Sequence, residues 1–216
     1  MNPRHTKFIA RVIAVFILVT LVTGISLPAY AAPGDLTRVS VDSSGAQANG
    51  RSYGGQLSRD GRYVAFASDA PNLVADDTNN VGDVFIKDRL TGVTTRVSVA
   101  SQTGAQANNG SGAAAISGDG RYVAFYSSAS NLVSGDANGI GDIFVHDRQA
   151  GLTTRVSVDS SGNEAHGQNS DYYLAISGDG RYVAFSSEAT NLVSGDTNGV
   201  GDIYVYDRQT SQTRRV

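Results

Sequence analysis

Short apolar runs separated by polar turns recur along this chain at a fixed spacing. The pattern Ser-x-Asp-Gly-Arg-Tyr-Val-Ala-Phe begins at positions 58, 117 and 177, which gives a period of 59 and then 60 residues. A period of this length is typical of a repeat architecture with one supersecondary unit per copy. Function must therefore come from the assembled array or from positions at which one copy differs.

Each repeat contains four strand signals. In the second repeat they are Ala113–Ile116, Arg121–Phe125, Asp142–Arg148 and Thr153–Val158. The first two are joined by Ser-x-Asp-Gly, in which Gly accepts a positive φ and the Ser and Asp side chains can bond nearby backbone N–H groups. The repeat is therefore predicted to be a four-stranded antiparallel sheet.

The strand Tyr-Val-Ala-Phe is apolar on both of its faces instead of alternating. Such a strand fits a sheet that is covered on both sides, as radially packed sheets are. The predicted mature part shows no sustained helical periodicity. These features predict an all-β fold of three β-propeller blades, a partial propeller. The blades span about residues 51–99, 110–158 and 170–216, with a lone outer strand at 37–41.

Residues 1–31 have the pattern of a secretory signal peptide. Three basic residues precede the apolar core Val12–Leu21, and Pro28–Ala31 offers a small-residue cleavage site before Ala32. The alternative is an uncleaved membrane anchor, because Phe8–Leu27 approaches spanning length. We expect a signal helix followed by a mature domain, residues 32–216, that is secreted or lies in the periplasm or cell envelope.

Charge narrows the classes of partner. The chain has 17 Lys and Arg against 20 Asp and Glu; without the three basic residues of the signal, 14 face 20, a net charge of −6. This balance argues against nucleic acid or an anionic membrane as partner, since both need clustered positive charge. The chain contains no cysteine, so burial and not disulfide bonds must hold the fold together.

The repeated nonapeptide resembles the Ser-Pro-Asp-Gly-Lys-x-Ile-Ala-Phe signature of TolB-type, WD-like propeller repeats in bacterial exported proteins. The resemblance covers residues 37–216 and implies a propeller that serves as a protein- or envelope-binding module. Arg59, Gly118 and Gly178 stand where the family usually has proline. TolB also has an α/β domain before its propeller, whereas here the repeats follow the predicted cleavage site within a few residues. The resemblance is therefore carried over for the fold and not for a place in the Tol–Pal system.

One loop of each repeat is a candidate calcium site. Oxygen-bearing side chains stand at its first, third and seventh positions and glycine at its sixth, as at the start of a calcium loop. The candidate ligands are Asp77, Asn79 and Asp83; Asp136, Asn138 and Asp142; and Asp196, Asn198 and Asp202.

The alternative is that these side chains only fold the loop through Asx turns. The fifth position is Val81, Ile140 or Val200, which can offer only a backbone carbonyl. The twelfth-position residues Asp88, Asp147 and Asp207 are separated from the loop by a predicted strand of about 16 Å and so are excluded as co-ligands. They are instead expected to pair at blade edges, with Arg96, Arg155 and Arg215 as candidate partners.

Catalytic signals are weak. His146 occupies a position that holds Lys87 and Tyr206 in the other repeats, so it is interpreted as a variable outward residue. His166 has only Asn163 and Glu164 as polar neighbours nearby in sequence. Two isolated histidines do not make a zinc site, and no Gly-x-Ser-x-Gly elbow is present. We expect a non-catalytic binding or scaffold module with no cofactor except, by hypothesis, calcium. The alternatives are a calcium-dependent structural or adhesion propeller and an accessory propeller fragment of a hydrolase.

Three blades are too few for a closed propeller, which uses about four to eight. Two blade faces should therefore remain open. We expect either a fragment of a longer propeller or two copies that pair into a six-bladed ring with exchanged end strands.

Overall fold

The computed structural model describes residues 36–216, apart from the side chains of residues 171 and 172. The predicted signal peptide, residues 1–31, lies outside the described residues. Within residues 36–216, no helix is both long enough and apolar enough to cross a membrane.

Twelve strands in the described residues form three four-stranded antiparallel sheets, and the strands of each sheet follow chain order. We call these sheets blades 1, 2 and 3. Blade 1 consists of β1 Ser52–Leu57, β2 Tyr63–Ser68, β3 Asp83–Asp88 and β4 Thr94–Arg96. Blade 2 consists of β5 Ser111–Ile116, β6 Tyr122–Ser127, β7 Asp142–Asp147 and β8 Leu152–Arg155. Blade 3 consists of β9 Asn169–Ile176, β10 Tyr182–Ser187, β11 Asp202–Asp207 and β12 Gln212–Arg215.

The turn between the first two strands of a blade is built as its sequence predicts. In blade 1, Ser58 Oγ donates to Asp60 Oδ1 (2.6 Å) and accepts from the Tyr63 amide (2.9 Å), while the Arg62 amide donates to Asp60 Oδ1 (3.0 Å). Gly61 takes a φ of 69°, which glycine reaches without steric penalty. Blades 2 and 3 repeat these contacts.

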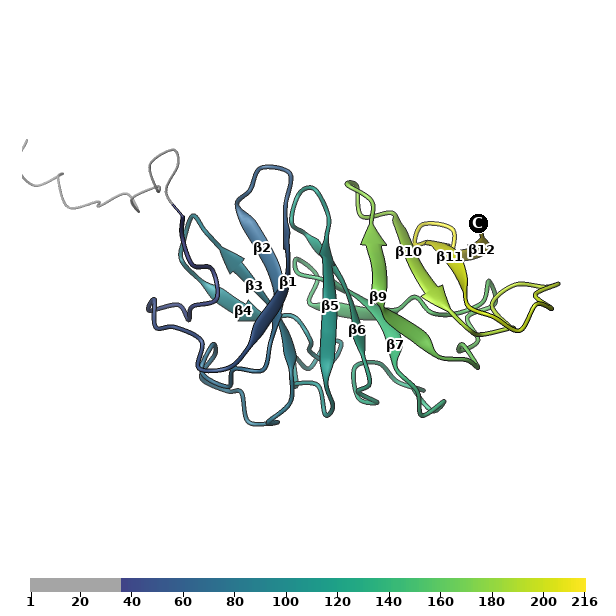
Figure 1. Ribbon diagram of the computed structural model, residues 1–216, viewed down its shortest axis with the longest axis horizontal. Coiled ribbons are helices and arrows are strands. Elements are labelled where there is room, and N and C mark those ends of the chain that lie inside the picture. The colour runs from purple at the N-terminus through teal and green to yellow at the C-terminus, as the bar shows by residue number, and fades with distance from the viewer. Residues whose placement is uncertain (1–35) are drawn as a thin grey trace, which may run out of the picture. The chain divides into compact units, whose positions relative to one another are not determined.

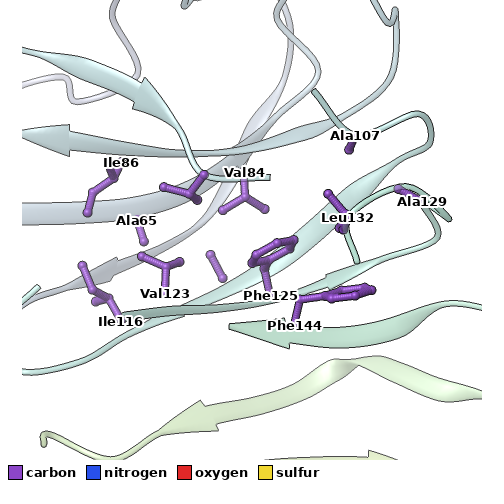
Figure 2. Close-up of a cluster of buried hydrophobic side chains, with 12 residues drawn as sticks. Ala65, Val84, Ile86, Ala107, Ile116, Val123, Phe125, Ala129, Leu132 and Phe144 are labelled. Carbon is purple, nitrogen blue, oxygen red and sulfur yellow. The ribbon is translucent and has the colours of Figure 1, made fainter. Parts of the chain in front are cut away.

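The blades pack face against face, and most of the core lies between them. Ala65, Val84 and Ile86 of blade 1 meet Phe125 and other residues of blade 2 in one buried cluster (Figure 2). A second cluster joins blade 2 to blade 3 in the same manner. We call these two contacts the first and second seams. They explain why Tyr-Val-Ala-Phe is apolar on both faces, and the predicted all-β propeller fold is confirmed.

The innermost strands of the three blades lie side by side, with β5 between β1 and β9 (Figure 1). The segment 37–41, expected to be a lone outer strand, forms only an isolated bridge between Val41 and Gln47. Among the described residues it is not part of any of the three sheets. Instead, its Val41 carbonyl accepts a hydrogen bond from Thr94 Oγ1 (2.6 Å) at the outer edge of blade 1.

Candidate functional site

The nine predicted calcium ligands lie in three equivalent loops, which we call the acidic loops: residues 77–83, 136–142 and 196–202. In each loop the asparagine Nδ2 donates to the last aspartate, at 2.8, 3.2 and 2.9 Å in blades 1 to 3. The asparagine Oδ1 accepts the backbone N–H two residues later, at 3.2, 3.1 and 3.2 Å. The asparagine therefore folds the loop through an Asx turn, as the alternative interpretation expected.

An arginine of the fourth strand reaches each acidic loop. In blade 2, Arg155 Nη1 lies 3.4 Å from Asp136 Oδ1 and 3.3 Å from Asp142 Oδ2, and it also contacts Glu164 Oε1. Arg96 and Arg215 take the same place. The corresponding distances to the first and last aspartates are 3.4 and 3.5 Å in blade 1 and 3.1 and 3.2 Å in blade 3.

The expectation that these arginines pair with Asp88, Asp147 and Asp207 is wrong, and strand register explains why. Arg96 is opposite Phe85, near the start of β3, whereas Asp88 ends β3 opposite Tyr63. Asp88 therefore accepts two hydrogen bonds from Arg62, from Nε at 3.0 Å and Nη2 at 2.7 Å. This fork lowers the pKa of Asp88 to about 2. Arg121–Asp147 and Arg181–Asp207 form the same fork.

Burial dominates the electrostatics of the acidic loops. It raises the pKa of Asp142, which is fully buried, against the lowering effects of Ser157, Arg155 and Asn138. Burial also raises the pKa of Asp136, and the neighbouring charge of Asp142 raises it further. Two desolvated carboxylates thus share one guanidinium, which supplies the positive charge that they need.

This donor set does not fit a resident calcium ion as it stands. Calcium takes about six to eight oxygens, but Asp142 Oδ1 already accepts from Ser157 Oγ (2.6 Å), and Asp142 Oδ2 accepts from Asn138 and Arg155. Carboxylate oxygens of Asp136, Asp142 and Glu164 do lie within 4.8 Å of one another. Calcium binding here stays a prediction with a condition: the ion must displace the guanidinium of Arg155.

Glu164 was not among the predicted residues. It follows blade 2 at the position that holds Gln47 and Gln106 in the other copies, and all three form the same isolated bridge. Its Oε1 accepts from the Ala137 amide (3.0 Å), as Gln106 Oε1 accepts from the Thr78 amide (3.2 Å). The charge difference at this position was visible in the sequence, but its proximity to the acidic loop was not.

His146 is buried, which corrects the interpretation of an outward residue. Its Nδ1 lies 3.0 Å from Thr153 Oγ1, and burial lowers its pKa. In blade 1, Lys87 is also buried here and donates from Nζ to the Asp42 and Gly92 carbonyls (2.9 and 2.6 Å). The position accepts different polar side chains because hydrogen-bond partners from the outer edge of the blade are available there.

The innermost strands form a second candidate site, a hollow of about 450 Å³. Its lining residues are Arg51, Tyr53, Gly54, Gln56, Gly112, Ala113, Ala114 and Leu174. The guanidinium of Arg51 lies 4.9 Å from the centre of the Tyr53 ring. Pairing of β1 with β2 and of β5 with β6 is interrupted by a register shift next to this hollow. No motif in the sequence marked this site.

Comparison with solved structures finds propellers. Over 77% of this chain, TolB from Acinetobacter baumannii is similar at 18% identity and a TM-score of 0.46. The β-propeller domain of the Trilobed protease from Pyrococcus furiosus also matches 77% of the chain, at 12% identity and a TM-score of 0.48. The blades of this chain are shown by its own three face-packed, four-stranded antiparallel sheets.

Proteins of another kind are similar to this chain over the same share of its length. Pyrococcus horikoshii acylaminoacyl peptidase matches 77% of the chain at 12% identity and a TM-score of 0.46. The matches to these three proteins span 32%, 42% and 24% of their own lengths. A scan against protein-family models finds no match, and neither does a comparison with curated proteins. The comparisons therefore leave the activity open.

Proposed function

We propose that this chain is an exported, non-catalytic propeller module that binds a segment of a partner protein of the cell envelope at the hollow between its innermost strands. The signal-peptide pattern of residues 1–31 supports export. The net negative charge of the remaining chain supports a protein partner over nucleic acid or an anionic lipid surface.

Backbone strain at the hollow is the observation that carries the proposal. Ala113 in β5 has a φ of 44°, in the left-handed region that a non-glycine residue rarely adopts. Gly54 holds the equivalent place in β1 with a φ of 69°. Such strain costs about 1–3 kcal/mol and persists mainly where the surrounding structure enforces it, often at binding sites. Here it accompanies the interrupted pairing that shapes the hollow.

The chemistry of the hollow favours an extended peptide with a carboxylate. Arg51 is an exposed cation, Tyr53 offers an aromatic surface, and Gln56 can both donate and accept hydrogen bonds. The small residues Gly54 and Gly112 leave room for the backbone of another chain to approach.

The charged groups elsewhere support a non-catalytic role. The fork aspartates are held by Arg62, Arg121 and Arg181, and the acidic loops by Arg96, Arg155 and Arg215. These pairs repeat in every blade, which is the behaviour of structural ion pairs. A reaction site, in contrast, would be expected at positions where one copy departs from the others.

A peptide-display experiment tests the proposal. A random peptide library is selected on the wild-type protein, and the binders are measured against an Arg51→Ala, Gln56→Ala variant. We expect acidic peptides whose Kd rises at least about tenfold in the variant, because a charge-assisted hydrogen bond is lost. Gln209→Ala, an exposed turn residue of blade 3, is the control. Binders that are equally tight in all three proteins would disprove this location.

A further inference from the structure

The two seams repeat one set of polar and aromatic contacts. In the first seam, Arg148 of blade 2 lies over the Tyr63 ring of blade 1, with its guanidinium carbon 4.4 Å from the ring centre. Arg148 Nη1 is anchored on the Gly120 carbonyl at 2.6 Å. In the second seam, Arg208 of blade 3 lies 4.0 Å from the centre of the Tyr122 ring of blade 2.

Glycine permits this close approach. A Cβ at Gly120 would lie 2.2 Å from Tyr63 Cδ2, and a Cβ at Gly180 would lie 2.2 Å from Tyr122 Cδ2. Backbone hydrogen bonds also run from blade to blade. The Arg59 amide donates to the Gly118 carbonyl (2.9 Å), and the Gly118 amide donates to the Gly178 carbonyl (2.9 Å). The equivalent turn residues 59, 118 and 178 thus link blade 1 to blade 2 and blade 2 to blade 3.

Blades 1 and 3 each carry one partner of the arginine–tyrosine contact that the two seams contain. Blade 1 carries Arg89, whose Nη1 is anchored on the Gly61 carbonyl at 2.7 Å, as Arg148 is on Gly120. Arg89 is exposed, and no described blade offers it a tyrosine. Blade 3 carries Tyr182, which is 41% exposed; among the described residues, the guanidinium over its ring is that of Arg181, its neighbour in the chain.

The apolar positions show the same relation. Ile203 of β11 is 40% exposed, whereas its counterpart Ile143 of β7 is fully buried in the second seam. Leu57 of β1 is 60% exposed, whereas its counterpart Ile116 of β5 is 9% exposed in the first seam. The open face of blade 3 therefore matches the face that blade 1 and blade 2 each bury. On the opposite side of blade 1 the innermost strand β1 is exposed, whereas Val64 and Phe66 of β2 are already buried at 5% and 3% exposure.

We infer that a second copy of this chain covers both open faces, so that two three-bladed chains form one closed six-bladed ring. Blade 3 of each copy packs on blade 1 of the other, with Arg89 of one copy over Tyr182 of its partner. Propellers have about four to eight blades, and two copies of the three described blades supply six. Two copies joined in this way are related by a twofold axis, the commonest symmetry of soluble oligomers.

The area sets an upper limit for the dimer interface. From strand spacing and rise, one blade face measures roughly 320 Å². The two new seams involve four such faces, or at most roughly 1,300 Å² in total, and they add less at blade 1, where Val64 and Phe66 are already buried. Ring closure also surrounds the hollow with six innermost strands, but the inference rests on the seams and does not require that the hollow bind a peptide.

Engineered disulfides give a direct test because the chain has no cysteine of its own. A Cβ at position 118 would lie 3.6 Å from Arg59 Cβ, which is suitable for a disulfide across the first seam. The series of turn contacts predicts the same approach between position 178 of one copy and position 59 of the other. Arg59→Cys with Gly178→Cys should therefore give a covalent dimer on a non-reducing gel. Arg59→Cys with Gly118→Cys, the matched control, should oxidise within one chain and run as a monomer.

Light scattering on the wild-type protein, purified in its natively processed form, should give twice the mass of the monomer. Arg89→Ala and Tyr182→Ala should each raise the dimer dissociation constant about tenfold, as loss of one cation–π contact in each seam implies. Gln149→Ala, on an exposed turn of blade 2, should leave it unchanged. A monomer at all concentrations, or a 59/178 cysteine pair that gives no covalent dimer while the 59/118 control oxidises, would overturn the inference.

Discussion

Blades 2 and 3 have nearly the same sequence in their second and third strands but differ in their surroundings. Ile143 and Ile203 occupy the same place in the two blades, yet the first is fully buried and the second is 40% exposed. Val145 and Val205 differ in the same direction. Blade 2 has a neighbour on both faces, and blade 3 has a neighbour on one. At these positions of the second and third strands, burial therefore comes from the adjacent blade.

The acidic loops show the same difference for charged groups. The side chain of Arg155 is 9% exposed and that of Asp142 is fully buried, whereas those of Arg215 and Asp202 are 34% and 22% exposed. The same ion pair is thus desolvated in blade 2 and partly hydrated in blade 3. Substitutions at matched positions should separate the effect of the neighbour from that of the residue.

The largest difference is expected for the arginines. Arg155→Ala leaves two buried carboxylates without their cation, which should lower the free energy of unfolding by about 3–5 kcal/mol. Arg215→Ala removes a more exposed cation and should lower it by less, about 1–3 kcal/mol, because Asp202 is partly hydrated and the buried Asp196 keeps its hydrogen bond from Tyr204. Urea unfolding of the two variants measures both values. Equal losses would mean that the neighbouring blade does not control the strength of these pairs.

The same variants test the calcium hypothesis. Millimolar calcium should raise the melting temperature of Arg155→Ala, because the ion can enter the vacated group of Asp136, Asp142 and Glu164 and stabilise the folded state by mass action. The wild-type melting temperature should be unchanged between calcium and chelator. A higher melting temperature of the wild-type protein in calcium would show that calcium displaces the guanidinium. No increase in either protein would show that the acidic loops act only as turns.

A smaller difference is expected for the apolar pair, and it should depend on protein concentration. Ile143→Ala should lower the free energy of unfolding by about 2–5 kcal/mol, because it leaves a cavity in a closed seam. Ile203→Ala should lower it by about 1 kcal/mol or less in dilute protein, where the face is hydrated. At concentrations at which the dimer forms, the loss from Ile203→Ala should increase. Thermal unfolding over a range of concentrations distinguishes these cases.

The smallest expected effect is a dependence of stability on pH. It compares Asp88, which ends the third strand of blade 1, with Asp142, which begins the third strand of blade 2. The pKa of Asp88 is lowered to about 2 by the Arg62 fork, so its stabilising contribution is present above about pH 4 and is lost as the pH falls toward the folded pKa. The difference between wild type and Asp88→Asn, at most about 1 kcal/mol for this partly exposed pair, should vanish in that window.

Asp142 should show the opposite slope. Because burial raises its pKa, the wild type should lose stability relative to Asp142→Asn as the pH rises above about 4. The slope is the informative quantity, since the hydrogen bond to Ser157 adds a constant difference. Slopes of the same sign for Asp88→Asn and Asp142→Asn would contradict the assigned causes.

The sequence predicted the elements of this fold because its signals are local. Ser58, Asp60 and Gly61 form the expected turn, and the strand after them is covered on both faces. The partners of Arg96 and Asp88 could not be read in the same way, because they depend on which residues face each other across the last two strands. The positive φ of Ala113 could not be predicted from the sequence either, because alanine is equally common at regular strand positions.

Thiol labelling at matched seam positions tests the central claim, that each blade face requires a neighbouring blade. Ile143→Cys should be protected from a thiol reagent at every protein concentration. Ile203→Cys should react rapidly in dilute protein and become protected as the concentration rises, with the same midpoint as the mass in light scattering. An Ile203→Cys thiol that reacts equally fast at all concentrations would show that nothing covers the open face of blade 3.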